Sequence, residues 1–192
     1  MAGPLRAGPV GPVVLGQGAE HDRGLHRRAG SAGVIRLVAL SAAERRRVAH
    51  LRPAPGQETF VRDGAYAAAE TDPLLDLYAI EEDGAVVGMF KLDRGYADAP
   101  RHDFARAGDL GLRGVLVDPA HEGRGIGRAL LTALPDLVRA SYPGFRRLVL
   151  TVNLRNTRAR AGYLKAGWRD DGGIYHGGDR GQQHILFLPL DV

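Results

Sequence analysis

Apolar residues recur at two spacings along the chain, and each spacing predicts a different kind of element. Short runs rich in Val, Ile and Leu, bounded by Gly, Pro or Asp, predict strands. Apolar residues at i, i+3, i+4 and i+7 predict helices with one buried face. Strands are expected at residues 34–38, 75–80, 85–92, 112–117, 147–152, 168–175 and 184–190, and helices at 41–50, 58–70, 126–138 and between 156 and 167.

Several short signals support these boundaries. Ser41-Ala42-Ala43-Glu44 is a capping box and predicts the start of a helix. Asp83-Gly84 between two apolar runs predicts a tight hairpin. Asn156 is a good N-cap, and Gly167 stands where a left-handed C-terminal cap is wanted. Pro135 removes a backbone donor, so we expect it to bend or interrupt its helix.

The first 33 residues differ from the rest of the chain. They are rich in glycine, proline and arginine and show no hydrophobic periodicity. Such a segment buries too little apolar surface to offset its ordering entropy. We expect residues 1–33 to be a disordered extension, or an upstream addition caused by a mis-set start, and residues 34–192 to form one domain.

Composition excludes several classes of protein. The 192 residues include no cysteine, which excludes a disulfide scaffold, a thiolate zinc site and a cysteine nucleophile. No apolar run approaches the ~20 residues needed to cross a bilayer, so we expect a soluble, cytoplasmic protein without a membrane partner. The net charge of +4 is spread along the chain and aromatics are 6%, so nucleic acid is not expected as a partner. The seven histidines are isolated, with His121 alone beside a functional motif, and no metal site is expected.

The most informative stretch is residues 111–138, which reads as a strand, a glycine loop and a helix. The loop contains Gly123, Gly125 and Gly127, and the first backbone N–H groups of the following helix have no intrahelical acceptor. The loop therefore suits a phosphate group. The dinucleotide fingerprint needs glycine at another spacing, and a P-loop needs Gly-Lys-Ser/Thr where Arg128-Ala129 follow Gly127.

Two blocks of residues resemble the GNAT superfamily of N-acetyltransferases. Val117-Asp118-Pro119 followed by Glu122-Gly123-Arg124-Gly125-Ile126-Gly127 is similar to its acetyl-CoA loop, although Glu122 stands where the family usually has Arg or Gln. The later family motif is matched by Val152, Asn153, Asn156, Ala159, Tyr163, Gly167 and Trp168. The resemblance covers about residues 34–190 and agrees with the predicted order of elements.

The resemblance implies a three-layer α/β (α+β) fold. It consists of a mixed, mostly antiparallel sheet of about seven strands flanked by about four helices, with two strands splayed apart to admit acetyl-CoA as cosubstrate. It also implies cofactor contacts from the central strand, the loop and the helix cap. These residues are Val115, Leu116, Val117, Glu122, Gly123, Arg124, Gly125, Ile126, Gly127, Arg128 and Asn156.

The implied reaction is direct attack of a primary amine on the thioester in a ternary complex, with a backbone N–H near Val117 stabilising the oxyanion. Tyr163 matches the family's general acid for the leaving thiolate. The family often places a glutamate base on the central strand, where this chain has Gly111. The base is therefore left open between Asp109, Glu81 and a water chain.

Two other functions stay open. A non-catalytic acyl-CoA-binding regulatory domain is motivated by Gly111 and Glu122, and an RNA-directed acetyltransferase by the positive charge. The acceptor is expected to be a small-molecule or peptide amine, chosen by the connections at residues 52–57, 93–109 and 171–183. A homodimer is possible.

Overall fold

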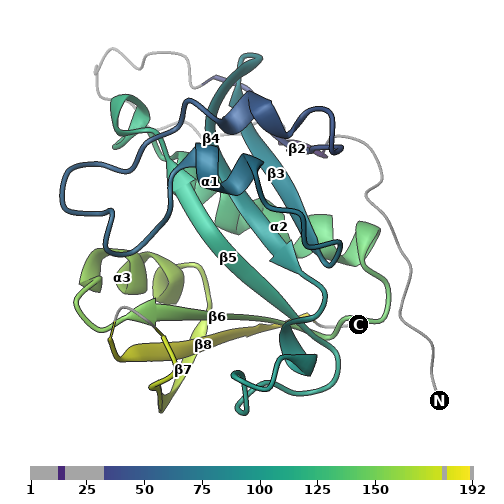
Figure 1. Cartoon of the computed structure of the whole chain (residues 1–192), viewed down its shortest axis with the longest axis vertical. Helices are drawn as coiled ribbons and strands as arrows, with labels where there is room; N and C mark the ends of the chain where they lie inside the picture. The colour runs from purple at the N-terminus through teal and green to yellow at the C-terminus, as the bar shows by residue number, and fades with distance from the viewer. Residues whose placement is uncertain (1–12, 16–32, 179–180, 191–192) are drawn as a thin grey trace, which may run out of the picture.

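The computed structural model describes residues 13–15, 33–178 and 181–190, and these form one eight-stranded sheet with helices on both faces (Figure 1). The spatial order is β1-β2-β3-β4-β5-β6-β8-β7. Every neighbouring pair is antiparallel except β5 and β6, which are parallel. The strands are β1 Val13–Leu15, β2 Ile35–Ala39, β3 Leu75–Glu82, β4 Ala85–Asp93, β5 Asp109–Val117, β6 Arg147–Asn153, β7 Arg169–Tyr175 and β8 Gln183–Pro189.

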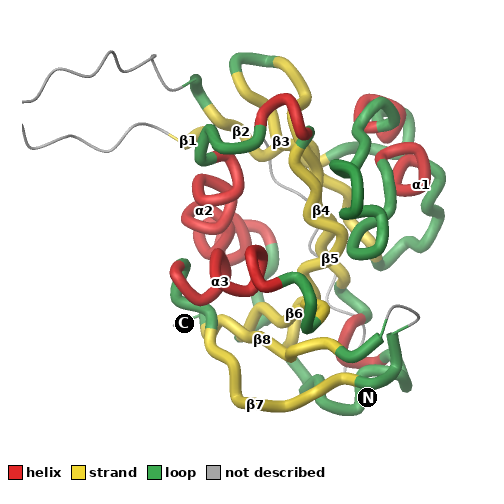
Figure 2. Tube along the Cα trace, turned by 90° about the vertical axis from the view of Figure 1, so that its left-hand side faces the viewer, coloured by secondary structure: helices red, strands yellow, loops and turns green. Residues whose placement is uncertain are grey.

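The helices divide between the two faces of the sheet (Figure 2). Helices α2 (Ile126–Ser141) and α3 (Thr157–Lys165) lie on one face. Helix α1 (Gly64–Ala68) lies on the other face, where it packs against the 3-10 helix η1 (Arg45–Val48). Two further 3-10 turns, η2 (Tyr96–Asp98) and η3 (Pro119–His121), flank β5 in sequence.

The predicted strands and the mostly antiparallel sheet are confirmed. Asp83 and Gly84 both have positive φ (50° and 86°), as the two-residue hairpin turn between β3 and β4 requires. Strand β1 is a correction, because residues 13–15 were placed in the disordered extension. These apolar residues pair with the backbone groups that β2 would otherwise leave open. The rest of the predicted extension, residues 1–12 and 16–32, lies outside the described residues.

The first two predicted helices are much shorter than expected, so that three α-helices are found among the described residues where about four were predicted. The Glu44 carboxylate accepts from the Ser41 N–H (3.0 Å), as in a capping box, but only the η1 turn follows. Helix α1 begins at the Asp63 cap, not at residue 58, because Gly64 packs directly onto η1. A Cβ at position 64 would lie 1.7 Å from the Val48 carbonyl oxygen.

The helix α2 is continuous through Pro135, so of the predicted bend or interruption the interruption does not occur. Its buried side packs against β-strand residues in the main core, and this packing outweighs one lost backbone hydrogen bond. That core includes Leu130, Leu134 and Leu137 of α2, with Phe90 and Leu110 of the sheet, all at most 1% exposed. A smaller core on the opposite face joins α1 and η1 to β3 and β4.

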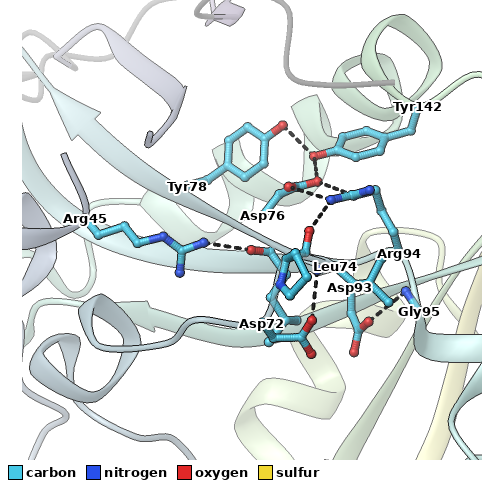
Figure 3. A network of polar contacts seen from close by, with 11 residues as sticks. Arg45, Asp72, Leu74, Asp76, Tyr78, Asp93, Arg94, Gly95 and Tyr142 are labelled. Carbon is cyan, nitrogen blue, oxygen red and sulfur yellow. Dashed lines mark hydrogen bonds and ion pairs between the residues drawn. The ribbon is translucent and has the colours of Figure 1, made fainter. Parts of the chain in front are cut away.

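A buried chain of polar groups ties the end of α2 to the sheet (Figure 3). The Tyr142 hydroxyl donates to the Asp76 carboxylate (2.9 Å) and lies 2.8 Å from the Tyr78 hydroxyl. Arg94 Nε donates to the same carboxylate (3.0 Å) and its guanidinium also donates to the Pro73 carbonyl. Burial raises the pKa of Tyr142 far above its ordinary value and that of Tyr78 to about 12, so both phenols stay protonated and act as donors.

We expect Tyr142→Phe to lower the free energy of unfolding by about 1–3 kcal/mol, because it leaves the buried Tyr78 hydroxyl without its partner and removes a donor from Asp76. Tyr78→Phe is the matched control, since the bond from Tyr142 to Asp76 survives and a smaller loss follows. Urea unfolding of both variants measures the difference. Equal losses would contradict the donor order Tyr78 to Tyr142 to Asp76.

Candidate active site

The site begins where β5 and β6 part. The two strands pair only through Asp109–Arg147, Leu110–Leu148 and Gly111–Val149, and beyond this point β6 pairs with β8 alone among the described strands. Figure 1 shows the two strands diverging from a common region. The predicted splay is therefore present, and it opens between residues 112–117 and 150–153.

Backbone N–H and C=O groups at the end of β5 face this gap. The Asp118 N–H donates to the Val87 carbonyl (2.8 Å), which makes Gly88 and Val117 a non-hydrogen-bonded pair of the β4–β5 ladder. Both backbone polar groups of Val117 therefore point away from β4 and towards the gap. Three residues earlier, Gly114 has φ +59° where the β4–β5 register shifts, so a β-bulge lies beside the splay.

The glycine loop and α2 form the other polar wall. Gly123 and Gly125 have positive φ (76° and 82°), and a Cβ at positions 123, 125 or 127 would meet nothing within 4 Å. Gly125 is the N-cap of α2 and provides no side-chain hydrogen bond to the helix. The N–H groups of the first turn are therefore left for a ligand, and the helix dipole favours an anion there.

A cavity of about 1750 Å³ runs through the splay to both faces of the sheet. On the side of α3 and the glycine loop it is lined by the cations Arg128, Arg158 and Lys165, with His121 nearby. On the side of α1 the lining changes to aromatic and acidic groups with two arginines. These residues are Phe60, Tyr66, Glu70, Asp72, Tyr96, Arg101, His102, Arg113 and Tyr175.

The predicted cofactor residues line this cavity, with Arg124 as the exception. Arg124 instead forms an ion pair with Glu82 (3.0 Å). Glu122, which departs from the family pattern, does line the cavity, but its carboxylate is paired with Arg158 (2.8 Å) and accepts from the Gln57 amide (3.4 Å). Its charge therefore has a cationic partner beside the predicted phosphate site.

The α3 residues of the later motif have separate roles in the structure. The Asn156 side chain accepts from the Ala159 N–H (3.2 Å) and caps the helix, as predicted, and it also lines the cavity. Tyr163 lines the cavity while its ring packs edge-on against Trp168 at 5.4 Å between centroids. Burial raises the pKa of Tyr163, so the phenol keeps its proton at neutral pH.

Neither predicted carboxylate base is among the residues that line the cavity. Asp109 is 2% exposed, and both of its oxygens are bound to Arg147 at 2.7 Å. Glu81 pairs with Arg47 at 2.5 Å on the face of the sheet covered by η1. The structure thus places both carboxylates in ion pairs away from the splay.

The aromatic residue Tyr96 explains the glycine on the central strand. A Cβ at position 111 would lie 2.1 Å from Cδ2 of the Tyr96 ring, which is buried and lines the cavity. The Tyr96 hydroxyl hydrogen-bonds to Thr151 of β6, so the ring spans the start of the splay. Gly111 therefore makes room for a side chain from the connection at residues 93–109.

His102, from the same connection, is a cavity residue that the sequence analysis missed. It is 6% exposed, and its ring stacks on Tyr96 with centroids 3.9 Å apart. Its sequence neighbourhood carries no motif, and only the folded connection brings it to the cavity. The preceding Arg101, also a lining residue, contacts its ring nitrogen.

The described residues contain no cluster of three or more His, Cys, Asp or Glu side chains able to hold a metal ion. None of the helices in the described part of the chain is long and apolar enough to cross a membrane.

A mixed sheet that splays beside a glycine loop at a helix N-terminus is the architecture that the sequence resemblance implied. The GNAT acetyltransferase family model matches residues 36–168, so the chain belongs to the GNAT family. No curated protein matches the sequence.

Solved structures agree on the fold. An aminoglycoside acetyltransferase AAC(6')-Ib in complex with coenzyme A is 15% identical, with a TM-score of 0.67 over 81% of this chain and 94% of that one. The ribosomal-protein-S18-alanine N-acetyltransferase from Escherichia coli is 19% identical (TM-score 0.57; 82% and 95%). Spermidine N-acetyltransferase from Vibrio cholerae, in complex with CoA and spermine, is 15% identical (TM-score 0.59; 81% and 95%).

Proposed function

We propose that this protein transfers the acetyl group of acetyl-CoA to a primary amine by direct attack in a ternary complex. The observation that carries the proposal is the cavity through the splay, which joins an anion-binding loop on one face of the sheet to a lobe containing acidic residues on the other. One cosubstrate can enter from each side, and the two can meet at the backbone of β5.

The phosphate side suits acetyl-CoA. Its pyrophosphate would take the free N–H groups of residues 125–128, and Arg128 and Lys165 supply positive charge. The pantetheine arm would lie along the gap and pair with the exposed backbone of Val117. Neighbours of this fold have been solved with coenzyme A, which supports the same assignment.

The chemistry follows from these positions. The amine nitrogen attacks the thioester carbon, and a backbone N–H of β5 stabilises the oxyanion. The C–S bond then breaks, Tyr163 donates a proton to the departing thiolate, and the phenol is reprotonated from solvent. The products are the acetylated amine and the free thiol of CoA, and no covalent enzyme intermediate is required.

The acceptor side suits an amine of modest size or a flexible peptide end. Glu70 and Asp72 attract an ammonium group on this side of the cavity. The exposed Tyr66 ring beside them already holds the Arg62 guanidinium (5.4 Å) and the Lys91 ammonium (5.9 Å). Structural neighbours are named for aminoglycosides, spermidine and a ribosomal-protein alanine, so these three chemistries form a rational panel.

The test combines binding and turnover. Acetyl-CoA at millimolar concentration is expected to raise the melting temperature, because it binds the folded state alone. With at least one of kanamycin, spermidine and an alanine-initiated peptide as acceptor, we expect the protein to release free CoA, which a thiol reagent measures. No thermal shift would exclude the function.

The tyrosine variant separates an enzyme from a non-catalytic acyl-CoA binder. In an enzyme, Tyr163→Phe is expected to lower turnover by about 100-fold while the thermal shift persists, since the thiolate loses its donor. Binding without turnover of any panel amine would favour the regulatory domain instead. Binding to tRNA that resists moderate salt would favour the RNA-directed alternative, because nonspecific phosphate contacts weaken steeply as salt rises.

A further inference from the structure

We propose that His102 is the general base of the acetyl transfer, an inference that rests on the proposed function. It would occupy the role that a carboxylate on the central strand would otherwise take. The position on that strand is Gly111, the Tyr96 ring packs directly against it, and the His102 ring stacks on Tyr96. The base therefore comes from the connection at residues 93–109 and not from β5.

Hydrogen bonds determine which nitrogen of His102 is available. Nδ1 lies 3.0 Å from the Tyr96 carbonyl oxygen, which can only accept, so Nδ1 carries the proton. Nε2 is then the nitrogen with the lone pair, and it accepts from Arg101 Nε at 3.3 Å. This tautomer presents a basic nitrogen and fixes the ring orientation through the backbone of η2.

The resting contact with Arg101 is long and replaceable. At 3.3 Å it lies beyond the usual range of an N–H hydrogen bond, and Arg101 is an exposed side chain that also lines the cavity. An acceptor amine can replace Arg101 at Nε2 while the hydrogen bond from Nδ1 to the Tyr96 carbonyl keeps the ring in position.

The surroundings keep His102 neutral near pH 7. Burial is the main cause that lowers the pKa of His102, and the nearby guanidinium groups of Arg101 and Arg113 act in the same direction. The hydrogen bond to the Tyr96 carbonyl is the second largest effect and raises the pKa of His102, as the Asp93 carboxylate does to the smallest extent, but burial outweighs them and the pKa stays lowered. The titratable and charged groups that face the ring are Asp93, Tyr96, Arg101, Arg113 and Tyr175.

The proton transfer must come at the attack step. A neutral imidazole is too weak a base to deprotonate a free alkylammonium, whose pKa is about 10.4. As the N–C bond forms, the amine nitrogen becomes positively charged and acidic, and Nε2 accepts its proton. The ammonium loses one proton to solvent before the attack, and the imidazolium releases the second to solvent afterwards. Reprotonation of the Tyr163 phenol takes one proton back, so a net of one proton leaves for each ammonium acetylated.

His102→Asn tests the role of Nε2 directly. The asparagine amide can still donate to the Tyr96 carbonyl, but it has no group at the position of Nε2. We expect kcat to fall by about 100-fold or more, with unchanged acetyl-CoA affinity by calorimetry. His50→Asn is the matched control, because His50 is exposed and contacts the Val86 carbonyl outside the cavity, and it should keep wild-type kcat.

A pH profile separates proton transfer from packing. His102 acts when neutral, so the rate rises with pH through its pKa. Arg101→Gln removes a cation that opposes protonation, which raises that pKa and moves the acidic limb to higher pH. Arg101→Lys keeps the charge and should move the limb less. Deprotonation of the acceptor amine adds a second pH dependence to the rate, and neither arginine variant should shift it.

The outcomes are distinguishable. The proposal is supported by three results together. The wild type turns over a panel amine, His102→Asn loses this turnover, and the acidic limb of the pH–rate profile shifts with the charge at residue 101. Turnover within about threefold of wild type in His102→Asn, or a Nε2-protonated tautomer in nitrogen-detected NMR, overturns it while the acetyltransferase function stands. Absence of turnover in the wild type overturns both.

Discussion

Acetyl-CoA is expected to bind a Gly125→Asp variant about 100-fold more weakly than a Gly125→Asn variant. The carboxylate would stand at the N-cap of α2, beside the proposed pyrophosphate. Two charges 5–6 Å apart at an effective dielectric constant near 20 repel by about 3 kcal/mol. Both side chains tolerate the left-handed conformation of residue 125 (φ 82°), so the comparison isolates the charge.

Gly172→Asn is the control for backbone strain in this experiment. Gly172 has nearly the same φ (84°) and open surroundings, but it belongs to β7 and does not line the cavity. Its acetyl-CoA affinity should equal that of the wild type. Titration calorimetry at fixed ionic strength measures all three variants, and equal affinities for the Asp and Asn variants would show that no phosphate lies near residue 125.

Gly111→Ala is expected to lower the free energy of unfolding by about 3 kcal/mol and to reduce kcat at the same time. The added methyl would overlap the base of the Tyr96 ring, 2.1 Å from Cδ2 and 2.5 Å from Cγ. A buried ring cannot yield without displacing its neighbours, and overpacking of this kind typically costs about 1–3 kcal/mol. His102 would move with the ring, because it stacks on Tyr96 and donates to its carbonyl.

A double-mutant cycle with Tyr96→Ala shows whether the ring is the cause. In the Tyr96→Ala background the methyl at position 111 has space, so Gly111→Ala should cost little further stability. Full additivity would mean that the methyl acts elsewhere. Gly162→Ala, an open helical position in α3, should instead stabilise the protein by up to about 1 kcal/mol.

Sequence signals were reliable where the cause is local. The hairpin at Asp83-Gly84, the Asn156 cap and the glycine loop depend on backbone angles that a few residues set by themselves, and all three are found as predicted. The predicted helices at residues 41–50 and 58–70 failed for a non-local reason. Gly64 packs onto the Val48 carbonyl, and this contact between η1 and α1 sets where each one ends.

The proposed catalytic residues also differ in whether the sequence alone could identify them. Tyr163 belongs to a motif of fixed spacing on α3, and the structure places it on the cavity. Asp109 is close in sequence to Gly111 of the central strand, yet its carboxylate forms an ion pair with Arg147 of the neighbouring strand. His102 lies in a connection without periodicity, and no spacing rule relates it to β5.

The sequence by itself determined the order of strands β2 to β8 along the chain, the family, the glycine loop and the splay that the family implies. These features follow from hydrophobic period, turn chemistry and motif spacing, which act over a few residues at a time. Only the tertiary structure decided which ionisable groups face the cavity. Ion pairs with residues distant in sequence remove Asp109 and Glu81 from it, and the packing of Tyr96 against Gly111 brings His102 to it.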